Sequence, residues 1–296
     1  MAIIELKDVS FVYGKKTPYE IKALDNVSLD IEENLITGLI GHTGSGKSTL
    51  VQLLNGLLRP TDGKVFVDGE DIWKNPKKIG QIRYKVGMVM QYPEYQLFAD
   101  TVWEDIAYGP KNMKLAPEEI EKRVQKSAEF CGIDKETLAK SPFDLSGGQK
   151  RRVALAGVMA MNPKILVLDE PAAGLDPKGR REILGGIRKY REESGSTVII
   201  VSHSMEDMAM YCDKVVVMSK SKVLLNGDCK DVFAHHRLLK ENGLDVPEIT
   251  NVVLNLREIG IDISEDIYTV DGAVQAICRK YCKTSNQVKK EGYDGI

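Results

Sequence analysis

The chain has 296 residues, 43% of them hydrophobic and 28% charged, with a formal net charge of -2. The length and composition fit one large domain with an appendage, or two domains, and the net charge gives no basic field that would attract nucleic acid. The five scattered cysteines include no CxxC pair, so neither a zinc site nor a disulfide framework is indicated. No apolar run approaches the ~18 residues that span a bilayer and early charges exclude a signal-peptide core, so we expect a cytosolic protein that meets a membrane only through a partner.

The N-terminal part is predicted to form strands around one helix. Asp25 and Asn26 suggest a turn within the second strand, and the Pro-Thr-Asp-Gly sequence at 60–63 marks another. Apolar residues at helical spacing predict a helix over 48–58. Alternating or densely apolar runs predict strands at 3–13, 21–31, 35–40, 64–67 and 86–90.

The middle of the chain, about 98–161, is rich in Glu and Lys and is predicted to be a helical subdomain inserted into an α/β core. Its helices are expected over 117–131 and 150–161. Dense β-branched runs beyond it predict buried parallel strands on either side of another helix. This alternation predicts a mostly parallel sheet. The strands are expected at 165–168 and 197–201, and the helix at 178–193.

The last part of the chain is predicted to be helical. An apolar stripe predicts a helix over 248–259 that Gly260 ends, and Thr269 is placed to cap a second helix. Two short amphipathic helices indicate a small domain or a partner surface, with a local core of their own as the alternative. The polar tail from Lys283 is expected to be loose.

A glycine-rich loop follows the third predicted strand and matches GxxxxGK[ST] at every specified position. Its backbone N–H groups would wrap the phosphates of ATP, and the next helix would add its positive end. Lys47 would reach the β- and γ-phosphates, and Ser48 would bind Mg²⁺. The strand before and the helix after disfavour a chance glycine-rich turn. The expected ATP-binding residues here are Gly41, His42, Thr43, Gly44, Ser45, Gly46, Lys47, Ser48 and Thr49.

Two carboxylates, Asp169 and Glu170, end the apolar run at 165–168. Ligands of open α/β sheets bind at the edge where parallel strands end. Asp169 would therefore hold Mg²⁺ through a water, and Glu170 would polarise the attacking water as general base. A strand followed by an acidic helix start is the alternative interpretation of this pair alone.

A third motif, LSGGQ, precedes a basic stretch: Leu145, Ser146, Gly147, Gly148 and Gln149. Alone it could be a helix cap with a glycine turn. In order with both phosphate motifs, it makes the chain resemble the ATP-binding cassette ATPases over about residues 2–228. The resemblance implies a P-loop cassette core with an antiparallel β subdomain and an inserted helical subdomain. Residues 229–296 would be a small C-terminal helical domain that contacts a dimer partner and ends in the loose tail.

The same resemblance assigns roles to single residues. Tyr13 stands where the family has an aromatic that stacks on adenine, with a core tyrosine as the alternative. Gln91 matches a glutamine that senses Mg²⁺ and the transport partner. Asp176 lies in the D-loop match. His203 matches the switch histidine that contacts the γ-phosphate, whereas a histidine in a loop without this context would more often be structural.

In this family two cassettes pack head to tail around two ATP molecules. The LSGGQ residues 145–149 would then serve the ATP held by the partner's loop. Because positioning and electrostatic stabilisation carry most of phosphoryl-transfer catalysis, one chain could not complete its own site. Hydrolysis should therefore require the dimer.

The segment after Gln91 looks like the Pro-acidic-x-Gln-apolar segment of the energy-coupling factor (ECF) ATPases. These drive bacterial micronutrient uptake with a transmembrane coupling protein and a substrate-binding membrane protein. The stretches GHTGSGKSTL, GQKRRVALAGVMAM and HSMEDMA are closest to the second type of ATPase subunit, which pairs with a first-type homologue. Ala172 departs from the Thr that the family often has there. The segment comprises Tyr92, Pro93, Glu94, Tyr95, Gln96, Leu97 and Phe98.

This resemblance implies that residues 92–98 receive a coupling helix of the membrane protein, because aromatic and apolar residues suit helix-in-groove docking. A hydrophobic loop packed on the helical subdomain is the alternative. It also implies an ATPase that uses ATP and Mg²⁺ at the cytoplasmic face of the cell membrane. The dimer would be a heterodimer, with a homodimer as the alternative. The cargo would be a vitamin such as riboflavin, folate or biotin, or else cobalt or nickel.

Other classes fit less well. Cassettes of DNA repair and chromosome structure need a long coiled-coil insert, for which the gap between the phosphate motifs is too short. Translation factors carry two cassettes, and this chain has one loop. A non-hydrolysing regulator would lack Glu170 or His203. The remaining alternative is an ATPase of a conventional importer or exporter with a different permease.

Overall fold

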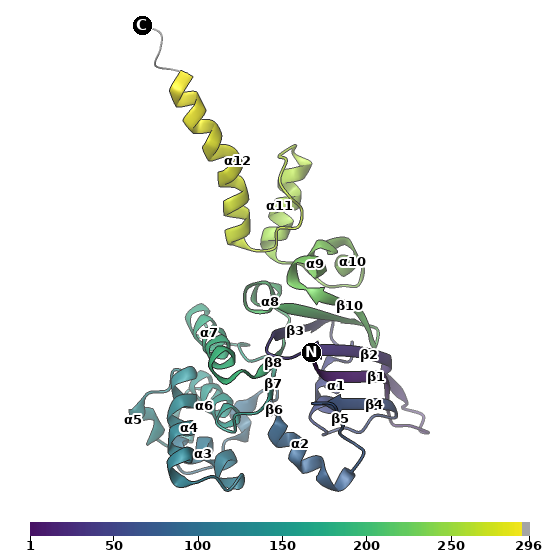
Figure 1. Ribbon diagram of the computed structural model, residues 1–296, viewed down its shortest axis with the longest axis vertical. Helices are drawn as coiled ribbons and strands as arrows, with labels where there is room; N and C mark the ends of the chain where they lie inside the picture. The colour runs from purple at the N-terminus through teal and green to yellow at the C-terminus, as the bar shows by residue number, and fades with distance from the viewer. Residues whose placement is uncertain (292–296) are drawn as a thin grey trace.

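The computed structural model describes residues 1–291, and it confirms the α/β architecture (Figure 1). The central sheet has the strand order β10-β9-β3-β8-β7-β6. Five of its strands run parallel, and β10 pairs antiparallel with β9 at one edge. The strands are β3 (Ile36–Gly41), β6 (Val86–Val89), β7 (Ile165–Asp169), β8 (Thr197–Val201), β9 (Lys214–Ser219) and β10 (Lys222–Asp228).

Every residue of β3 and β8 is buried, because both faces of the central sheet are covered. Neighbouring residues of one strand enter opposite hydrophobic clusters, as Leu166 and Val167 of β7 do. The predicted strands at 35–40, 86–90, 165–168 and 197–201 are thereby confirmed. The prediction missed β9, although its Val-Val-Val run is as apolar as β8, and it missed the half-exposed β10.

A second, antiparallel sheet has the order β2-β1-β4-β5. The turn expected at Asp25 and Asn26 is wrong, because β2 continues through both residues. Asn26 instead has a left-handed φ of 51° beside shifts in the β1–β2 register, so it marks an irregularity within the pair. The strands are β1 (Ala2–Tyr13), β2 (Ile21–Glu32), β4 (Asp62–Val67) and β5 (Glu70–Asp71).

The helices beside the sheets differ from expectation mainly at their ends. The first ends at Leu54 rather than at residue 58, and the buried amide of the next residue, Asn55, donates to Val86 O at 2.7 Å. The helix expected over 178–193 is confirmed, with Asp176 as its N-cap. These elements are α1 (Lys47–Leu54), η1 (Pro76–Lys78), α2 (Ile79–Lys85), α7 (Pro177–Ser194) and α8 (Met205–Tyr211).

The middle of the chain forms the expected group of helices between β6 and β7. Its last helix begins at Gly147 rather than at residue 150, because Ser146 and Gln149 form a capping box that starts the helix inside LSGGQ. The elements are α3 (Val102–Asn112), α4 (Pro117–Phe130), α5 (Lys135–Leu138), η3 (Pro142–Asp144) and α6 (Gly147–Met159).

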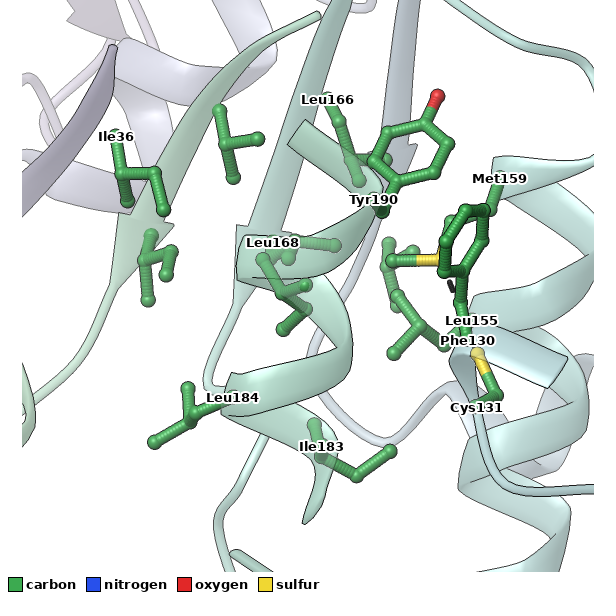
Figure 2. Packing of buried hydrophobic residues seen from close by; sticks show 14 of the residues in the cluster. Ile36, Phe130, Cys131, Leu155, Met159, Leu166, Leu168, Ile183, Leu184 and Tyr190 are labelled. Carbon is green, nitrogen blue, oxygen red and sulfur yellow. Dashed lines mark hydrogen bonds between the residues drawn. The ribbon is translucent and has the colours of Figure 1, made fainter. Parts of the chain in front are cut away.

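Helix α7 joins this helical group to the central sheet. Figure 2 shows Tyr190 of α7 between Leu166 of the sheet and the side chains of Phe130 and Met159, and Ile183 and Leu184 of α7 belong to the same cluster. The rings of Phe130 and Tyr190 meet edge to face at 5.5 Å. The approach is close enough that a Cβ on Gly186 would lie 1.9 Å from Phe130 O.

The C-terminal helices fall into two groups. Phe233 and Leu239 of the first two belong to the main hydrophobic cluster. The last two project away from the body (Figure 1) and share a small cluster that includes Val253 and Ile267. The boundary expected at residue 228 stays a prediction, and this packing favours a later one. The helices are α9 (Cys229–Ala234), α10 (His236–Glu241), α11 (Glu248–Glu258) and α12 (Val270–Glu291).

Thr269 caps the last helix as expected, since its Oγ1 accepts from Gly272 N at 3.2 Å. The helix continues past Lys283 to Glu291. The looseness of the tail stays a prediction, and residues 292–296 lie outside the described part. Over the part that the structure describes, no helix combines the length and apolar character needed to cross a bilayer.

Candidate functional site: a nucleotide cleft at the edge of the parallel sheet

The glycine-rich loop joins β3 to α1. Gly46 has a φ of 103°, and a Cβ there would lie 2.4 Å from Ala23 O, so the loop needs glycine at this position. Lys47 is buried, and its Nζ donates to Gly41 O at 2.6 Å and to His42 O at 3.1 Å. Burial lowers the pKa of Lys47, while the nearby Glu170 and Asp169 raise it. The ammonium group therefore lies at the loop with carboxylates opposite.

A cleft of about 390 Å³ opens above this loop. One buried polar atom at the cleft, Glu170 Oε1, has no hydrogen-bond partner in the described part of the chain. A buried polar atom without a partner calls for an explanation such as a bound ligand, and its place at the cleft fits a site for ATP. Ser45 Oγ also has no partner there, but Ser45 is fully buried and does not line the cleft. The lining residues that the sequence predicted are Tyr13, Thr43, Gly44, Gly46, Lys47, Ser48, Thr49, Gln91, Asp169, Glu170 and His203.

Asp169 and Glu170 stand at the carboxyl end of β7. Glu170 has a left-handed φ of 54°, a conformation that costs free energy in a non-glycine residue, and its N–H donates to Val201 O at 2.9 Å. Burial raises the pKa of both carboxyls, and the neighbouring Asp169 raises that of Glu170 further. The strained backbone thus holds a carboxylate of raised pKa at the cleft. Asp169 fits Mg²⁺ together with Ser48 and Gln91, which also line the cleft, because carboxylate, hydroxyl and amide oxygens suit this cation.

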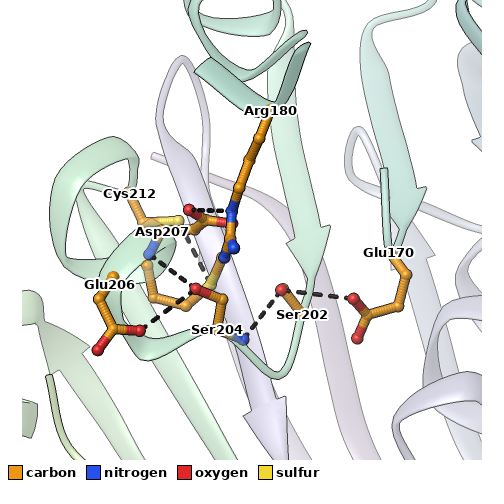
Figure 3. A network of polar contacts seen from close by, with 8 residues as sticks. Glu170, Arg180, Ser202, Ser204, Glu206, Asp207 and Cys212 are labelled. Atoms are coloured by element: carbon orange, nitrogen blue, oxygen red, sulfur yellow. Dashed lines mark hydrogen bonds and ion pairs between the residues drawn. The ribbon is translucent and has the colours of Figure 1, made fainter. Parts of the chain in front are cut away.

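His203 follows β8 and completes this end of the cleft. Its Nε2 lies 3.6 Å from Glu170 Oε1. Burial lowers the pKa of the imidazole, and Lys47 lowers it further, so the neutral form is favoured. Ser202, which the motif analysis missed, places its Oγ 3.5 Å from Glu170 Oε2 (Figure 3). Its position directly before the predicted histidine is a signal that could have identified it.

Tyr13 and Gln91 enter the cleft from the antiparallel sheet and from the end of β6. The Tyr13 hydroxyl lies 3.2 Å from Thr49 Oγ1, and its ring meets Phe11 edge to face at 4.8 Å. The ring is still 42% exposed, so one part of it is accessible to a base. The sequence motifs missed the contribution of β2, from which Ile21, Lys22 and Ala23 also line the cleft.

The LSGGQ residues do not line this cleft. Leu145 is buried, whereas Ser146, Gly147 and Gln149 are exposed at the start of α6. Ser146 Oγ accepts from Gln149 N at 3.4 Å, and Gln149 Oε1 accepts from Ser146 N at 3.0 Å. The interpretation of the motif as a helix cap is therefore correct, and the cap leaves an exposed helix N-terminus, a favourable place for phosphate.

Asp176 is also absent from the cleft lining. Its Oδ1 accepts from Gly179 N at 2.9 Å and caps α7. The site residues therefore fall into a nucleotide cleft and separate groups at the starts of α6 and α7.

Residues 92–98 lie beyond Gln91 and include the short helix η2 (Pro93–Gln96). Pro93 is buried, and Glu94 pairs with Arg151 of α6 at 3.2 Å, so both hold the segment in place. The side chain of Tyr95 points to solvent, with 85% of its surface exposed, and that of Tyr92 is 55% exposed. The remaining three residues border a second cavity of about 280 Å³ between α3 and α6: Gln96, Leu97 and Phe98.

Comparison with known proteins agrees with this geometry. The ABC transporter family model matches residues 24–173. The chain is 53% identical to the energy-coupling factor transporter ATP-binding protein EcfA2 of Clostridium perfringens, over 93% of this chain and 96% of that protein. It is 52% identical to the protein of the same name from Clostridium acetobutylicum, over 93% and 97%.

Solved structures show the same fold. The structure of cbiO1 from Clostridium perfringens, described as part of the ABC transporter complex cbiONQ, has a TM-score of 0.73 at 38% identity and covers 85% of this chain and 98% of that one. A dimeric ATP-binding cassette in a post-hydrolysis state with ADP and Pi has a TM-score of 0.69 at 30% identity, covering 76% and 98%.

Proposed function

We propose, because this chain belongs to the ABC transporter family and within it to the energy-coupling factor transporter ATP-binding proteins, that it is the ATP-hydrolysing motor subunit of such a transporter. The observation that carries the proposal is the buried oxygen Glu170 Oε1, which has no hydrogen-bond partner in the described part of the chain and lies beside His203 at the cleft. A carboxylate held in this way can accept a proton from a water molecule.

The loop residues bind and orient the nucleotide. The backbone N–H groups of residues 41–48 surround the phosphates, and the positive end of α1 faces them. Lys47, now bonded to loop carbonyls, turns its ammonium group to the β- and γ-phosphates. Tyr13 stacks on the base from the rim of the cleft. Contacts with ATP would therefore replace the hydrogen bonds that Lys47 makes to the loop carbonyls.

The hydrolytic step depends on the residues at the ends of β7 and β8. Ser48, Asp169 and Gln91 would hold Mg²⁺, which neutralises phosphate charge when bound. Glu170 takes the proton from the attacking water. Neutral His203 donates a hydrogen bond to the γ-phosphate. Ser202 holds one oxygen of Glu170, leaving the other free to accept the proton.

The exposed LSGGQ start of α6 would complete the site of a second cassette, so the active unit is a dimer. We propose a first-type ECF ATPase as partner, with a homodimer as the alternative. Residues 92–98 would dock a transmembrane coupling protein, and through the complex a substrate-binding membrane protein. The chain would then lie peripherally at the cytoplasmic face of the cell membrane and drive uptake of a vitamin or another micronutrient.

Replacing Glu170 by Gln tests the motor function. The Glu170→Gln chain is expected to bind ATP with Mg²⁺ and to accumulate as a closed dimer, while its turnover falls at least about a hundredfold because the proton acceptor is lost. Size-exclusion chromatography with ATP and a phosphate-release assay measure both effects. Turnover at the level of the unmodified chain would exclude Glu170 as the base.

The docking segment is tested separately by purifying the membrane complex and identifying its subunits. Tyr95→Asp or Leu97→Asp is expected to reduce recovery of the membrane partner, because a carboxylate is costly to bury in an apolar groove. The matched control is Tyr19→Asp, since Tyr19 is equally exposed at 84% but far from the segment in the chain. Undiminished assembly of both segment variants would contradict the docking role.

A further inference from the structure

An ion pair joins two helices that start beside the nucleotide cleft. Arg180 lies in the first turn of α7, and Asp207 lies in the first turn of α8. Arg180 Nε donates to the two carboxylate oxygens of Asp207 at 2.9 and 2.8 Å, and an Nη2 of the same guanidinium lies 2.7 Å from Oδ2 (Figure 3). Charge-assisted hydrogen bonds of these lengths are stronger than hydrogen bonds between neutral groups.

The carboxylate of this ion pair is largely shielded from water. The Asp207 side chain is 11% exposed and the Arg180 side chain 39%. The hydrogen bond to Asp207 is the main cause that raises the pKa of Arg180. If Arg180 alone were replaced by a neutral residue, a buried carboxylate would lose its cation, which costs more than removing both charges. The two residues should therefore behave as one unit.

Each member of the pair is tied to a residue of the site by a helix cap. Asp176 caps α7, and its carbonyl oxygen accepts from Arg180 N at 2.9 Å. Ser204 caps α8 by accepting from Asp207 N at 3.2 Å, and it directly follows His203. The ion pair thus connects the proposed D-loop residue to the proposed switch histidine through few bonds.

The loop of residues 202–204, which carries the proposed switch histidine, lies beside the carboxylate of Glu170. Ser204 N donates to Ser202 Oγ at 3.1 Å, and Ser202 Oγ in turn lies 3.5 Å from Glu170 Oε2. His203 stands between these serines, with its Nε2 3.6 Å from Glu170 Oε1. A shift of α8 relative to α7 would therefore change the distances from both His203 and Ser202 to Glu170.

We propose that Arg180 and Asp207 are positioning residues for hydrolysis, which fix α8 against α7 so that the switch histidine keeps one place relative to Glu170 and the D-loop. The proposal rests on the functions proposed above for Asp176 and His203. Neither member of the pair lines the nucleotide cleft, so the pair acts on turnover rather than on ATP binding.

A double-mutant cycle tests this in the full-length chain within its ATPase assembly. Arg180→Gln and Asp207→Asn are each expected to lower kcat about tenfold while the KM for ATP stays within about twofold. The double variant is expected to lose about as much as either single variant, not the roughly hundredfold product of independent sites. Arg180→Lys, which keeps the charge without the fork, should lie between Arg180→Gln and the unmodified chain.

Arg188→Gln is the matched control, because Arg188 lies on the same helix and pairs with Glu192 in solvent; it is expected to keep the kcat of the unmodified chain. Unchanged kcat in Asp207→Asn, a multiplicative loss in the double variant, or a raised KM at constant kcat would each overturn the positioning role. A fall in kcat that only follows a matching fall in thermal midpoint would do the same. Turnover retained by His203→Ala would instead refute the proposed function.

Discussion

At the scale of single residues, Glu170 combines three unfavourable features. Its backbone is left-handed, its carboxyl is largely buried, and one oxygen has no partner in the described part of the chain. Residues held in such states persist only when their surroundings fix them, and they gather at functional sites. The position of Glu170 in the chain, directly after an apolar strand, was predictable from sequence, but its backbone strain and its orphaned oxygen were not.

The pH dependence of turnover should report the ionisation of Glu170. Burial and Asp169 raise its pKa, so the carboxyl takes up a proton while the pH is still above the ordinary range of a glutamate. Turnover needs the ionised form, and it is therefore lost as the pH falls through this raised pKa. Ser202→Ala removes a hydrogen bond that favours the ionised form, so the acid limb of the kcat profile should move to higher pH. An acid limb that moves to lower pH in this variant would contradict the assignment.

Short motifs predict some residues of the site but not the contacts between packed helices. Lys47, Asp169 and His203 were predictable because each lies in a short motif at the end of a strand. The contact between Arg180 and Asp207 depends on how α7 and α8 pack, and these residues are separated in the chain by β8. No local spacing encodes that pairing, so the sequence alone could not supply it.

At the scale of elements, the ends of α7 and α6 show how well helix boundaries can be predicted from the sequence. The predicted range of α7, 178–193, agrees with the structure to within one residue at each end, where the helix follows the Asp176 cap and stops before Gly195. The predicted start of α6 is three residues late, because the helical periodicity begins only after LSGGQ, whereas the Ser146 cap starts the helix inside that motif. Caps that double as functional motifs are therefore a source of error in helix boundaries.

Two adjacent glycines of α7 should respond oppositely to alanine. A Cβ on Gly186 would lie 1.9 Å from Phe130 O, whereas a Cβ on Gly185 meets nothing within 4 Å. Gly186→Ala is expected to destabilise the chain by about 1–3 kcal/mol through overpacking. Gly185→Ala should be neutral or stabilise it by up to about 1 kcal/mol through helix propensity. Urea unfolding measures both, and equal effects would show that α7 does not lie this close to α4.

At the scale of the whole molecule, the hydrophobic clusters separate a cassette from its last two helices. Composition and motif order were enough to predict the α/β core and the helical insert. The expected boundary at residue 228 follows from the extent of the family resemblance, whereas the packing of Phe233 and Leu239 into the main cluster depends on tertiary contacts. Long-range packing of this kind has no signature in local periodicity.

Two truncations should separate folding from dimer contact. Removing residues 248–296 takes away the cluster of Val253 and Ile267 and, from the main cluster, only the partly buried Tyr268, which stacks on Phe233 at 5.9 Å. The thermal midpoint should then stay close to that of the full chain, while ATPase dimers dissociate more readily in sedimentation experiments. Removing residues 229–296 also strips Phe233 and Leu239 from the core, so this chain should unfold at a lower temperature. An unchanged dimer after removal of residues 248–296 would contradict a dimer-contact role for α11 and α12.

The exposed start of α6 has a consequence for genetics. If Ser146 faces a nucleotide bound by another subunit, lesions at Ser146 and at Lys47 of one polypeptide damage different composite sites. In a pair of unlike subunits, each site could then be silenced alone by choosing which residue of this single chain to alter. Two such alleles, expressed from separate copies, would not restore one intact enzyme by mixing, because every assembled pair would still contain one damaged site.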